Sequence, residues 1–244
     1  MIKFFRKIRQ RLLTENKFSK YLIYAIGEII LVVIGILIAL SINNWNNRNK
    51  EEQKEFVYIK SMIEDIESDI MQSENIIKRL DLTVIRIDTL LIELSSQHIY
   101  YNSNKAYNLF ISSAGFADFT PNDRTMQLLK NSGGFELISH KEASDAIWEY
   151  DKSVKLFHSQ DYMMGNALSN MNMIELPFDL ISLNNPFKNQ SAIPLLSNDQ
   201  KVLNNMYYNR LYWRVGTNSL KVRVQKVHDT GIETVGILKS IYGL

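Results

Sequence analysis

The chain of 244 residues contains no cysteine, which excludes disulfide bonds, thiolate metal sites and thiol nucleophiles. Its four histidines are isolated from one another, and none belongs to an HExxH motif. No GxxxxGK[ST] phosphate loop occurs. A Ser/His/Asp site assembled from distant residues would leave no such pattern, so catalysis stays a third hypothesis. We expect a protein that is not an enzyme and that needs no cofactor or metal ion.

Long hydrophobic runs are also absent, with one exception. The run YLIYAIGEIILVVIGILIALSI covers residues 21–42 and holds a single charged residue, Glu28. A helix of this length spans about 33 Å, which is sufficient for a hydrocarbon core of about 30 Å. Ala39-Leu40-Ser41 loosely resembles a signal-peptide cleavage site, but the apolar region of a signal peptide has only about 7–15 residues. The length favours one uncleaved transmembrane helix, a signal anchor.

Positive charge is concentrated in residues 1–20, where seven lysines and arginines oppose only Glu15. The positive-inside rule therefore places the N-terminus in the cytoplasm and the residues after the helix in the periplasm of a bacterium. The protein is predicted to lie in the inner membrane. Because the whole chain carries only +2, the remainder is acidic, which argues against nucleic acid as a partner.

The segments on either side of the transmembrane helix are suited to membrane surfaces. Residues 1–20 separate apolar from basic positions on a helix, as in a segment that lies among lipid headgroups; a disordered basic flank is the alternative. Residues 43–55 form a juxtamembrane collar in which Trp45 is the expected interface anchor. The lipid bilayer is thus the first predicted partner.

Glu28 lies about 10 Å inside the membrane by this topology. Gly35 and Ala39 follow it by seven and eleven residues, so the three share one face of the helix. A carboxylate beside small residues is typical of a contact between membrane helices. We expect this face to bind a second copy or another envelope membrane protein. The alternative is a protonated glutamate that lipid tolerates.

A heptad repeat begins after the collar and continues from Phe56 to Leu94. Eleven of its twelve seam positions are apolar, and Ser73 is the exception. With Ile63 at position a, the e positions are largely charged and the g positions include three large apolar residues. The apolar face is wider than a two-stranded coiled coil requires. The sequence therefore predicts a long helix packed in a helical bundle, with residues 56–244 as one periplasmic domain and an all-α fold.

Further helices are predicted along this domain. A short one covers residues 106–112; another starts at Thr120 as N-cap with Pro121 at its first position and ends at Gly133-Gly134. A third long helix starts with Ser139 as N-cap and is bounded by Pro177.

A connection over residues 177–197 contains three of the four prolines and several large apolar residues, which we expect to pack on the bundle. The last helix starts with Ser197 as N-cap and reaches Tyr242, with Gly216 and Gly231 as expected points of bending or division.

Two charged residues interrupt the apolar stripes of the last two long helices. Asp161 and Arg210 occupy seam positions on helices that we expect to be antiparallel neighbours. One hypothesis is an ion pair across the core. The other is that each lies at the edge of its stripe and faces water.

Two blocks of sequence carry a resemblance to a known family. The block IKFFRKIRQRLLTENKFSKYLIYAIGEIILVVIGILIALSINNWNN resembles the N-terminal hallmark of an uncharacterised family of single-pass membrane proteins of Bacteroidota, a domain of unknown function. The block TMQLLKNSGGFELISHKEASDAIWEY is similar to a second, weaker family motif. Ser41 departs from the glutamine expected in many relatives. The resemblance implies an envelope location and a mostly helical ectodomain, without any activity or catalytic residue.

We therefore expect a non-enzymatic helical interaction or scaffold protein that is anchored in the cell envelope. The alternative is a periplasmic ligand-sensing bundle that acts through a membrane partner. An apolar or aromatic pocket of a few hundred cubic ångströms between the helices would favour the sensor.

Overall fold

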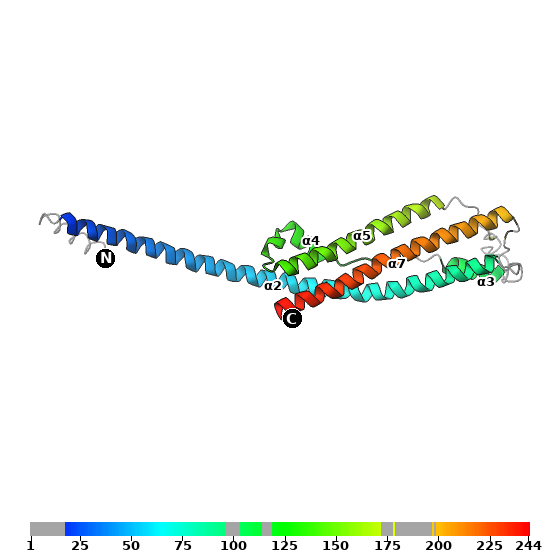
Figure 1. The fold of residues 1–244 in the computed structure, drawn as a ribbon, viewed down its shortest axis with the longest axis horizontal. Coiled ribbons are helices and arrows are strands. Elements are labelled where there is room, and N and C mark those ends of the chain that lie inside the picture. Colours follow the sequence, from blue (N-terminus) through cyan, green and yellow to red (C-terminus); the bar gives the residue numbers. More distant parts are fainter. Residues whose placement is uncertain (1–17, 96–102, 114–118, 172–177, 179–196, 198) are drawn as a thin grey trace, which may run out of the picture. The chain divides into compact units, whose positions relative to one another are not determined.

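The computed structural model describes residues 18–95, 103–113, 119–171, 178, 197 and 199–244. These residues form helices joined by turns (Figure 1). The α-helices are α2 (Phe18–Ser95), α3 (Ser103–Ser112), α4 (Arg124–Asn131), α5 (Lys141–Met171) and α7 (Gln200–Tyr242), and a 3₁₀ helix, η2, covers Gly134–Leu137. The all-helical prediction is confirmed for this part of the chain. Most of the basic segment and of the 177–197 connection lies outside the described residues.

The chain divides into two units, Met1–Glu55 and Phe56–Leu244. The first contains the N-terminal part of α2, and α2 is long and apolar enough to cross a membrane. Its large apolar side chains from Leu22 to Ile42 are 47–72% exposed. A helix that is apolar on all sides is suited to a nonpolar surrounding.

The second unit is a bundle in which α2, from Phe56 onward, packs beside α5 and α7 (Figure 1). The predicted helix through the heptad region is confirmed, because α2 continues without a break to Ser95. The wide apolar face is confirmed too: the g residues Met62, Ile76 and Leu90 are at most 5% exposed. Phe56 is the exception among the seam residues, since 43% of it is exposed.

Three ion pairs and one glutamate–histidine contact join α2 to α7 along one side of their contact within the described residues. Asp88 pairs with Arg214 and Asp81 with Lys221, while Glu74 lies 3.7 Å from His228 and Glu67 lies 2.7 Å from Lys239. The four acidic residues occupy four of the five e positions of the heptad, and their partners run in the opposite direction along α7. Each exposed pair contributes little stability. Together they identify an antiparallel contact with one register.

The helix starts differ from the predicted ones by a few residues. The structure begins α4 at Arg124, so Thr120 and Pro121 lie in the preceding loop, which α2 holds through Asp65 and Asp69. At the start of α5, the first helical residue is Lys141, one position later than an N-cap at Ser139 would give. Such small shifts are common at helix ends. The short helix predicted at 106–112 begins three residues earlier.

The N-cap of α7 is Asp199, and the prediction of Ser197 is wrong. The Asp199 carboxylate accepts a hydrogen bond from the Lys201 N–H at 2.7 Å, whereas the Ser197 hydroxyl accepts one from the Asp199 N–H at 3.2 Å. The negative charge of the aspartate complements the partial positive charge at the start of the helix. Ser197 thus stabilises the residue that caps the helix.

Glycines have distinct roles in α4 and α7. The predicted stop after α4 is confirmed, because Gly133 has a left-handed φ of 67°. In contrast, α7 passes through Gly216 and Gly231 as one helix of 43 residues, so the predicted division there is wrong. A Cβ atom at Gly231 would lie 3.0 Å from Cγ1 of Ile70 and 3.3 Å from Cγ2 of Ile66. The missing side chain allows α7 to approach α2 closely.

Alanine substitutions of two glycines in α7 test this explanation. In Gly236→Ala, the new methyl group meets no atom within 4 Å, so we expect better helix propensity to stabilise the fold by about 1 kcal/mol. In Gly231→Ala, the contact with Ile70 should cancel or outweigh that gain. Urea unfolding followed by circular dichroism measures both variants. Equal stabilisation by the two would contradict a packing role for Gly231.

Candidate functional site

The contact face predicted from Glu28, Gly35 and Ala39 lies on the exposed N-terminal part of α2. Glu28 is half-buried, Ala39 is exposed, and a Cβ atom at Gly35 would meet nothing within 4 Å. The helix is continuous through all three, so they share one face as expected from their spacing. Trp45 is 70% exposed. That this face binds another membrane helix stays a prediction.

A pair of carboxylates on α2 holds the loop that leads into α4. Asp65 accepts hydrogen bonds from the Asn122 side chain at 2.7 Å and from the Thr125 N–H at 3.1 Å. Asp69 accepts one from the Asn122 N–H at 2.8 Å. Because Thr125 lies in the first turn of α4, Asp65 caps that helix from a different helix. We call this arrangement, with Asp65, Asp69, Asn122, Thr125 and Tyr150, the acidic clasp.

Tyr150 of α5 completes the acidic clasp. Its hydroxyl donates to Asp69 at 2.6 Å, and the two residues are 5% and 1% exposed. Burial raises the pKa of Asp69; the hydrogen bonds from Tyr150 and Asn122 oppose this shift, and the nearby Asp65 adds to it. Burial and the Asp69 carboxylate raise the pKa of Tyr150. The clasp ties three helices together, and its Asp69–Tyr150 hydrogen bond is buried, whereas Asn122 is exposed.

A second polar cluster surrounds Asp151 on α5. Lys130 and Lys155 lie 2.7 and 2.6 Å from its carboxylate oxygens, and each amine is 5.8 Å from the centre of the Trp148 ring. Trp148 also stacks on Phe135, with the ring centres 4.5 Å apart. Burial opposes the charge of Asp151, but the two lysines together lower its pKa. This cluster joins α4 and η2 to α5.

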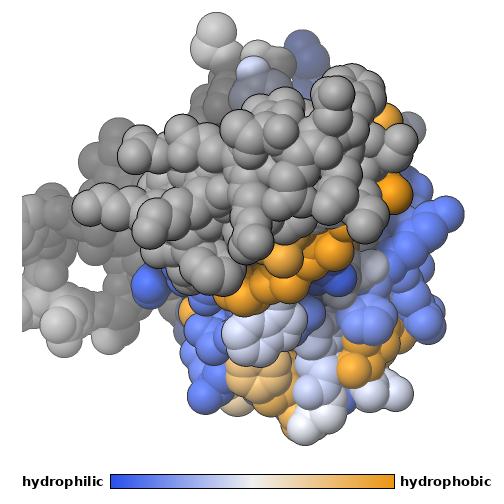
Figure 2. Space-filling view, turned by 90° about the vertical axis from the view of Figure 1, so that its left-hand side faces the viewer, coloured by the Kyte–Doolittle hydropathy of each residue, from blue (hydrophilic) through white to orange (hydrophobic). Residues whose placement is uncertain are grey.

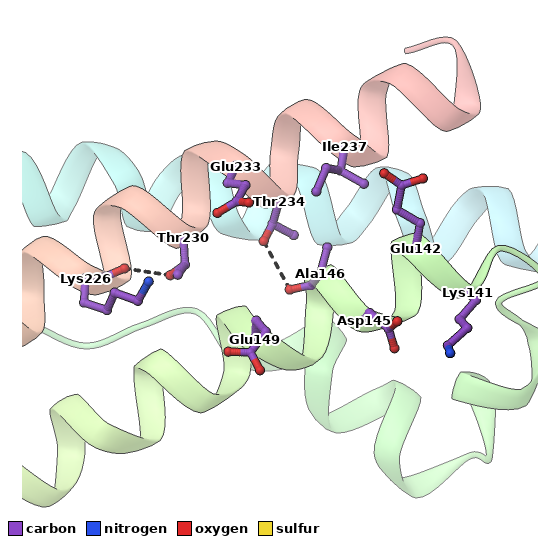
Figure 3. A pocket seen from close by; sticks show the side chains of 10 residues that line it. All are labelled: Lys141, Glu142, Asp145, Ala146, Glu149, Lys226, Thr230, Glu233, Thr234 and Ile237. Carbon is purple, nitrogen blue, oxygen red and sulfur yellow. Dashed lines mark hydrogen bonds between the residues drawn. The ribbon is translucent and has the colours of Figure 1, made fainter.

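An open groove of about 600 Å³ lies between α5 and α7 (Figure 3). Most of its charged side chains are acidic: Glu142, Asp145 and Glu149 from α5 and Glu233 from α7. Two threonines of α7 line it, and the Thr234 hydroxyl donates to the Ala146 carbonyl at 3.2 Å. Aromatic residues do not line this groove. The groove is open and six of its ten lining residues are charged, unlike an enclosed ligand pocket lined by hydrophobic and aromatic side chains.

Arg210 and Asp161 occupy different environments. Arg210 is 6% exposed, with its guanidinium carbon 3.8 Å from the centre of the Phe110 ring and Nη1 donating to the Ser113 hydroxyl at 3.4 Å. Burial lowers its pKa to about 10. Asp161 is half-buried on α5. Among the ion pairs given for the described residues, none joins these two, and their pairing stays a prediction.

The space-filling view shows apolar patches between polar ones on the described surface (Figure 2). Several large side chains of the bundle contribute exposed apolar area. On α5 these include Tyr162 and Met163, which are 71% and 65% exposed. Scattered apolar side chains are ordinary on a protein surface, so only a continuous stripe indicates an interface.

Comparison with known proteins gives one family. Residues 28–140 match the family described as "Family of unknown function (DUF6090)". No curated protein matches the chain, and no solved structure does. The match agrees with the expected resemblance to an uncharacterised domain family. The matched region, residues 28–140, contains both carboxylates of the acidic clasp and the loop that they bind, while Tyr150 lies outside this region.

Proposed function

We propose that this protein is a non-enzymatic interaction or scaffold protein of the bacterial cell envelope, anchored by the N-terminal part of α2. The observation that carries the proposal is the apolar stretch from Leu22 to Ile42, in which the large apolar side chains that the structure describes are at least 47% exposed. Burying such side chains in lipid is strongly favourable, since each contributes about 1.5–3 kcal/mol. In this proposal the basic segment stays in the cytoplasm and the helical bundle occupies the periplasm.

The anchor also supplies the proposed docking surface. Glu28, Gly35 and Ala39 share one face, and small residues allow a second helix to approach closely. A carboxylate on that face favours a polar or cationic group of a partner helix within the membrane. The partner is a second copy of the chain or another envelope membrane protein.

The ligand-sensing alternative has less support. Six of the ten residues that line the groove between α5 and α7 are charged. A small-molecule site is usually enclosed and mostly apolar. Among the described residues, this groove therefore favours docking over sensing of an apolar ligand.

Replacing Glu28 tests the docking surface. We expect Glu28→Leu to reduce recovery of a membrane partner at least tenfold after affinity purification in mild detergent, because leucine offers no acceptor. Glu28→Gln keeps the shape and a hydrogen-bonding group and should retain part of the recovery. Mass spectrometry of the purified material identifies and quantifies the partner.

The matched control is Ile30→Ala, since residue 30 lies on the opposite side of the same helix. It should leave recovery unchanged at equal expression. If Glu28→Leu and Ile30→Ala recover the same proteins as the natural chain, the proposed face is not the docking surface. If the natural chain is released from membranes by carbonate at high pH, the anchor itself is disproved.

A further inference from the structure

A stripe of large apolar side chains runs along the side of α7 that faces away from the bundle core. We define it as the outer stripe, and its five members are at least 40% exposed. Their exposed fractions are Tyr208 70%, Leu211 40%, Tyr212 56%, Val215 57% and Val222 65%.

The outer stripe has the spacing of a second heptad. Tyr208, Val215 and Val222 lie seven residues apart, so they occupy the same heptad position, and Leu211 lies three residues after the first of them. In coiled-coil terms the three are a positions and Leu211 is a d position. Trp213, Leu220 and Val224 are at most 5% exposed and lie on the opposite side of the helix, facing the core. One helix therefore carries two apolar seams.

None of the neighbouring helices α2, α3 and α5 covers the outer stripe. Contacts with α3 and the residue after it use Arg210 and Trp213, which lie on the core side of α7. Contacts with α2 use Arg214 and Lys221, while contacts with α5 use Thr230 and Thr234. Those contact positions flank the core seam. The outer stripe is thus an exposed apolar face of α7 in the described part of the bundle, with the half-buried Asn218 between Val215 and Val222.

We propose that the outer stripe binds the outer stripe of a second copy of this chain, with the two α7 helices parallel and in register. The spacing supports a helical partner, and β-branched valine at a positions favours two strands. The stripe offers apolar area on the order of 500 Å² per copy. Pairing two copies then buries about 1,000 Å², which is near the lower limit for a specific interface.

The parallel orientation rests on the proposed function. Two copies inserted in the same direction in one membrane present their bundles in the same direction. Confinement to the membrane also raises the effective concentration, so a small interface is sufficient. The inference deepens the proposed function by naming a second copy as one partner and by assigning it a surface in the bundle.

Polar residues limit and align the paired region. Lys201 and Asp229 are the next a positions beyond the two ends of the stripe. In a parallel pair, each of these residues lies beside the same residue of the second copy. The repulsion between the two like charges ends the seam there. Asn218 occupies the d position between Val215 and Val222 and is half-buried. A single polar residue within an apolar seam fixes the register at some cost in stability.

Single-cysteine variants test the pairing, because the natural chain contains no cysteine. Full-length Tyr208→Cys, Val215→Cys and Val222→Cys are oxidised in native membranes and separated on non-reducing gels. Disulfide formation requires Cβ atoms about 3.5–4.5 Å apart. We expect a disulfide-linked dimer at each of the three positions, at least fivefold more than in two control variants. The controls are Met71→Cys on α2 and Met163→Cys on α5, which are as exposed as the stripe.

Two results would overturn the inference. One is a dimer yield at the three stripe positions that does not exceed the controls. The other is antiparallel pairing, in which Tyr208→Cys and Val222→Cys link to each other in mixed membranes but not to themselves. The disulfide-linked dimer is measured only in the chain that stays in the membranes after carbonate extraction. Loss of the chain from membranes would disprove the proposed function, whereas a membrane-bound chain without stripe cross-links disproves only the pairing.

Disrupting the stripe supplies an independent measurement. Val222→Lys in the Val215→Cys chain should reduce the disulfide-linked dimer at least fivefold, because it places like charges face to face. Met71→Lys in the same chain is the matched control and should leave the yield unchanged. Both sites are exposed, so helicity and Tm should stay as in the parent chain. An unchanged yield with Val222→Lys would overturn the proposal.

Discussion

We expect Asp69→Leu to lower the free energy of unfolding of the bundle by about 1–3 kcal/mol. Leucine fits an apolar interior but accepts no hydrogen bond, so the Tyr150 hydroxyl and the Asn122 N–H lose their partner. Leaving the buried Tyr150 hydroxyl unsatisfied costs about 1–3 kcal/mol, whereas the exposed Asn122 can bond to water instead. Chemical denaturation of the full-length chain in detergent, followed by circular dichroism, measures the change. Glu64→Leu, an exposed acidic residue on the same helix, is the control and should shift stability by less than about 0.5 kcal/mol.

A double-mutant cycle separates the hydrogen bond from other effects of the substitution. Tyr150→Phe removes the hydroxyl that donates to Asp69. In the double variant Asp69→Leu/Tyr150→Phe, the unsatisfied hydroxyl is absent, so part of the lost stability should return. We expect a coupling energy of about 1–3 kcal/mol. Additive effects of the two substitutions would show that the acidic clasp does not depend on this hydrogen bond.

The same carboxylate predicts a pH dependence with a defined sign. Burial raises the pKa of Asp69, so the folded chain holds this proton more tightly than the unfolded chain. Its contribution to stability is therefore fully present below the ordinary aspartate pKa and is lost as the pH rises through the raised value. Between neutral pH and about pH 4, acidification should stabilise the natural chain relative to Asp69→Asn. Parallel denaturation curves at several pH values check the sign.

Periodicity explains why the sequence alone predicts the long helices. The heptad from Phe56 to Leu94 is a local property of the chain, and its wide apolar face requires more than one neighbouring helix. The heptad pattern also predicts that the charged e positions lie beside the apolar seam of a and d positions. Their partners on α7 could not be assigned, because an acidic residue has no sequence signal that selects one of many distant lysines and arginines. Only the folded register identifies Arg214 and Lys221 as partners.

The acidic clasp is the main feature that sequence reasoning missed. Asp65 and Asp69 are four residues apart and look like ordinary surface charges of a helix. One signal was available: Asp69 belongs to the g series that also contains Met62, Ile76 and Leu90, all buried. A carboxylate among buried positions requires a hydrogen-bond donor. The donors lie more than fifty residues away in the sequence. The heptad pattern therefore indicates that Asp69 needs a hydrogen-bond donor, but it does not identify Asn122 or Tyr150 as that donor.

Helix caps were predicted less accurately for a related reason. Ser197 and Asp199 are both good N-cap residues. The sequence does not show which of the two side chains accepts a hydrogen bond from a backbone N–H in the first turn of α7. At α4, the local signal of Thr120 and Pro121 competes with the capping that Asp65 supplies from α2. Tertiary contacts decide such cases, so the existence of a helix is predicted more reliably than its first residue.

Arg210→Met should stabilise the bundle by about 1–2 kcal/mol, the opposite of the usual effect of a core substitution. The guanidinium is buried, burial lowers its pKa to about 10, and within the described residues its Nε atom donates no hydrogen bond. The shift from 12.5 corresponds to a cost of about 3 kcal/mol at most for keeping the charge in the core. Its contact with the Phe110 ring offsets about 1–2 kcal/mol of that cost.

Methionine has a similar length, and its sulfur also packs well against an aromatic ring, so the volume stays filled. Arg214→Met is the matched control one turn later in α7, because Arg214 is only half-buried and pairs with Asp88. That substitution should lower stability by up to about 1 kcal/mol. Opposite signs for the two variants would show that the buried arginine is a cost to folding. A loss of more than 1 kcal/mol with Arg210→Met would show instead that its charge stabilises the folded bundle.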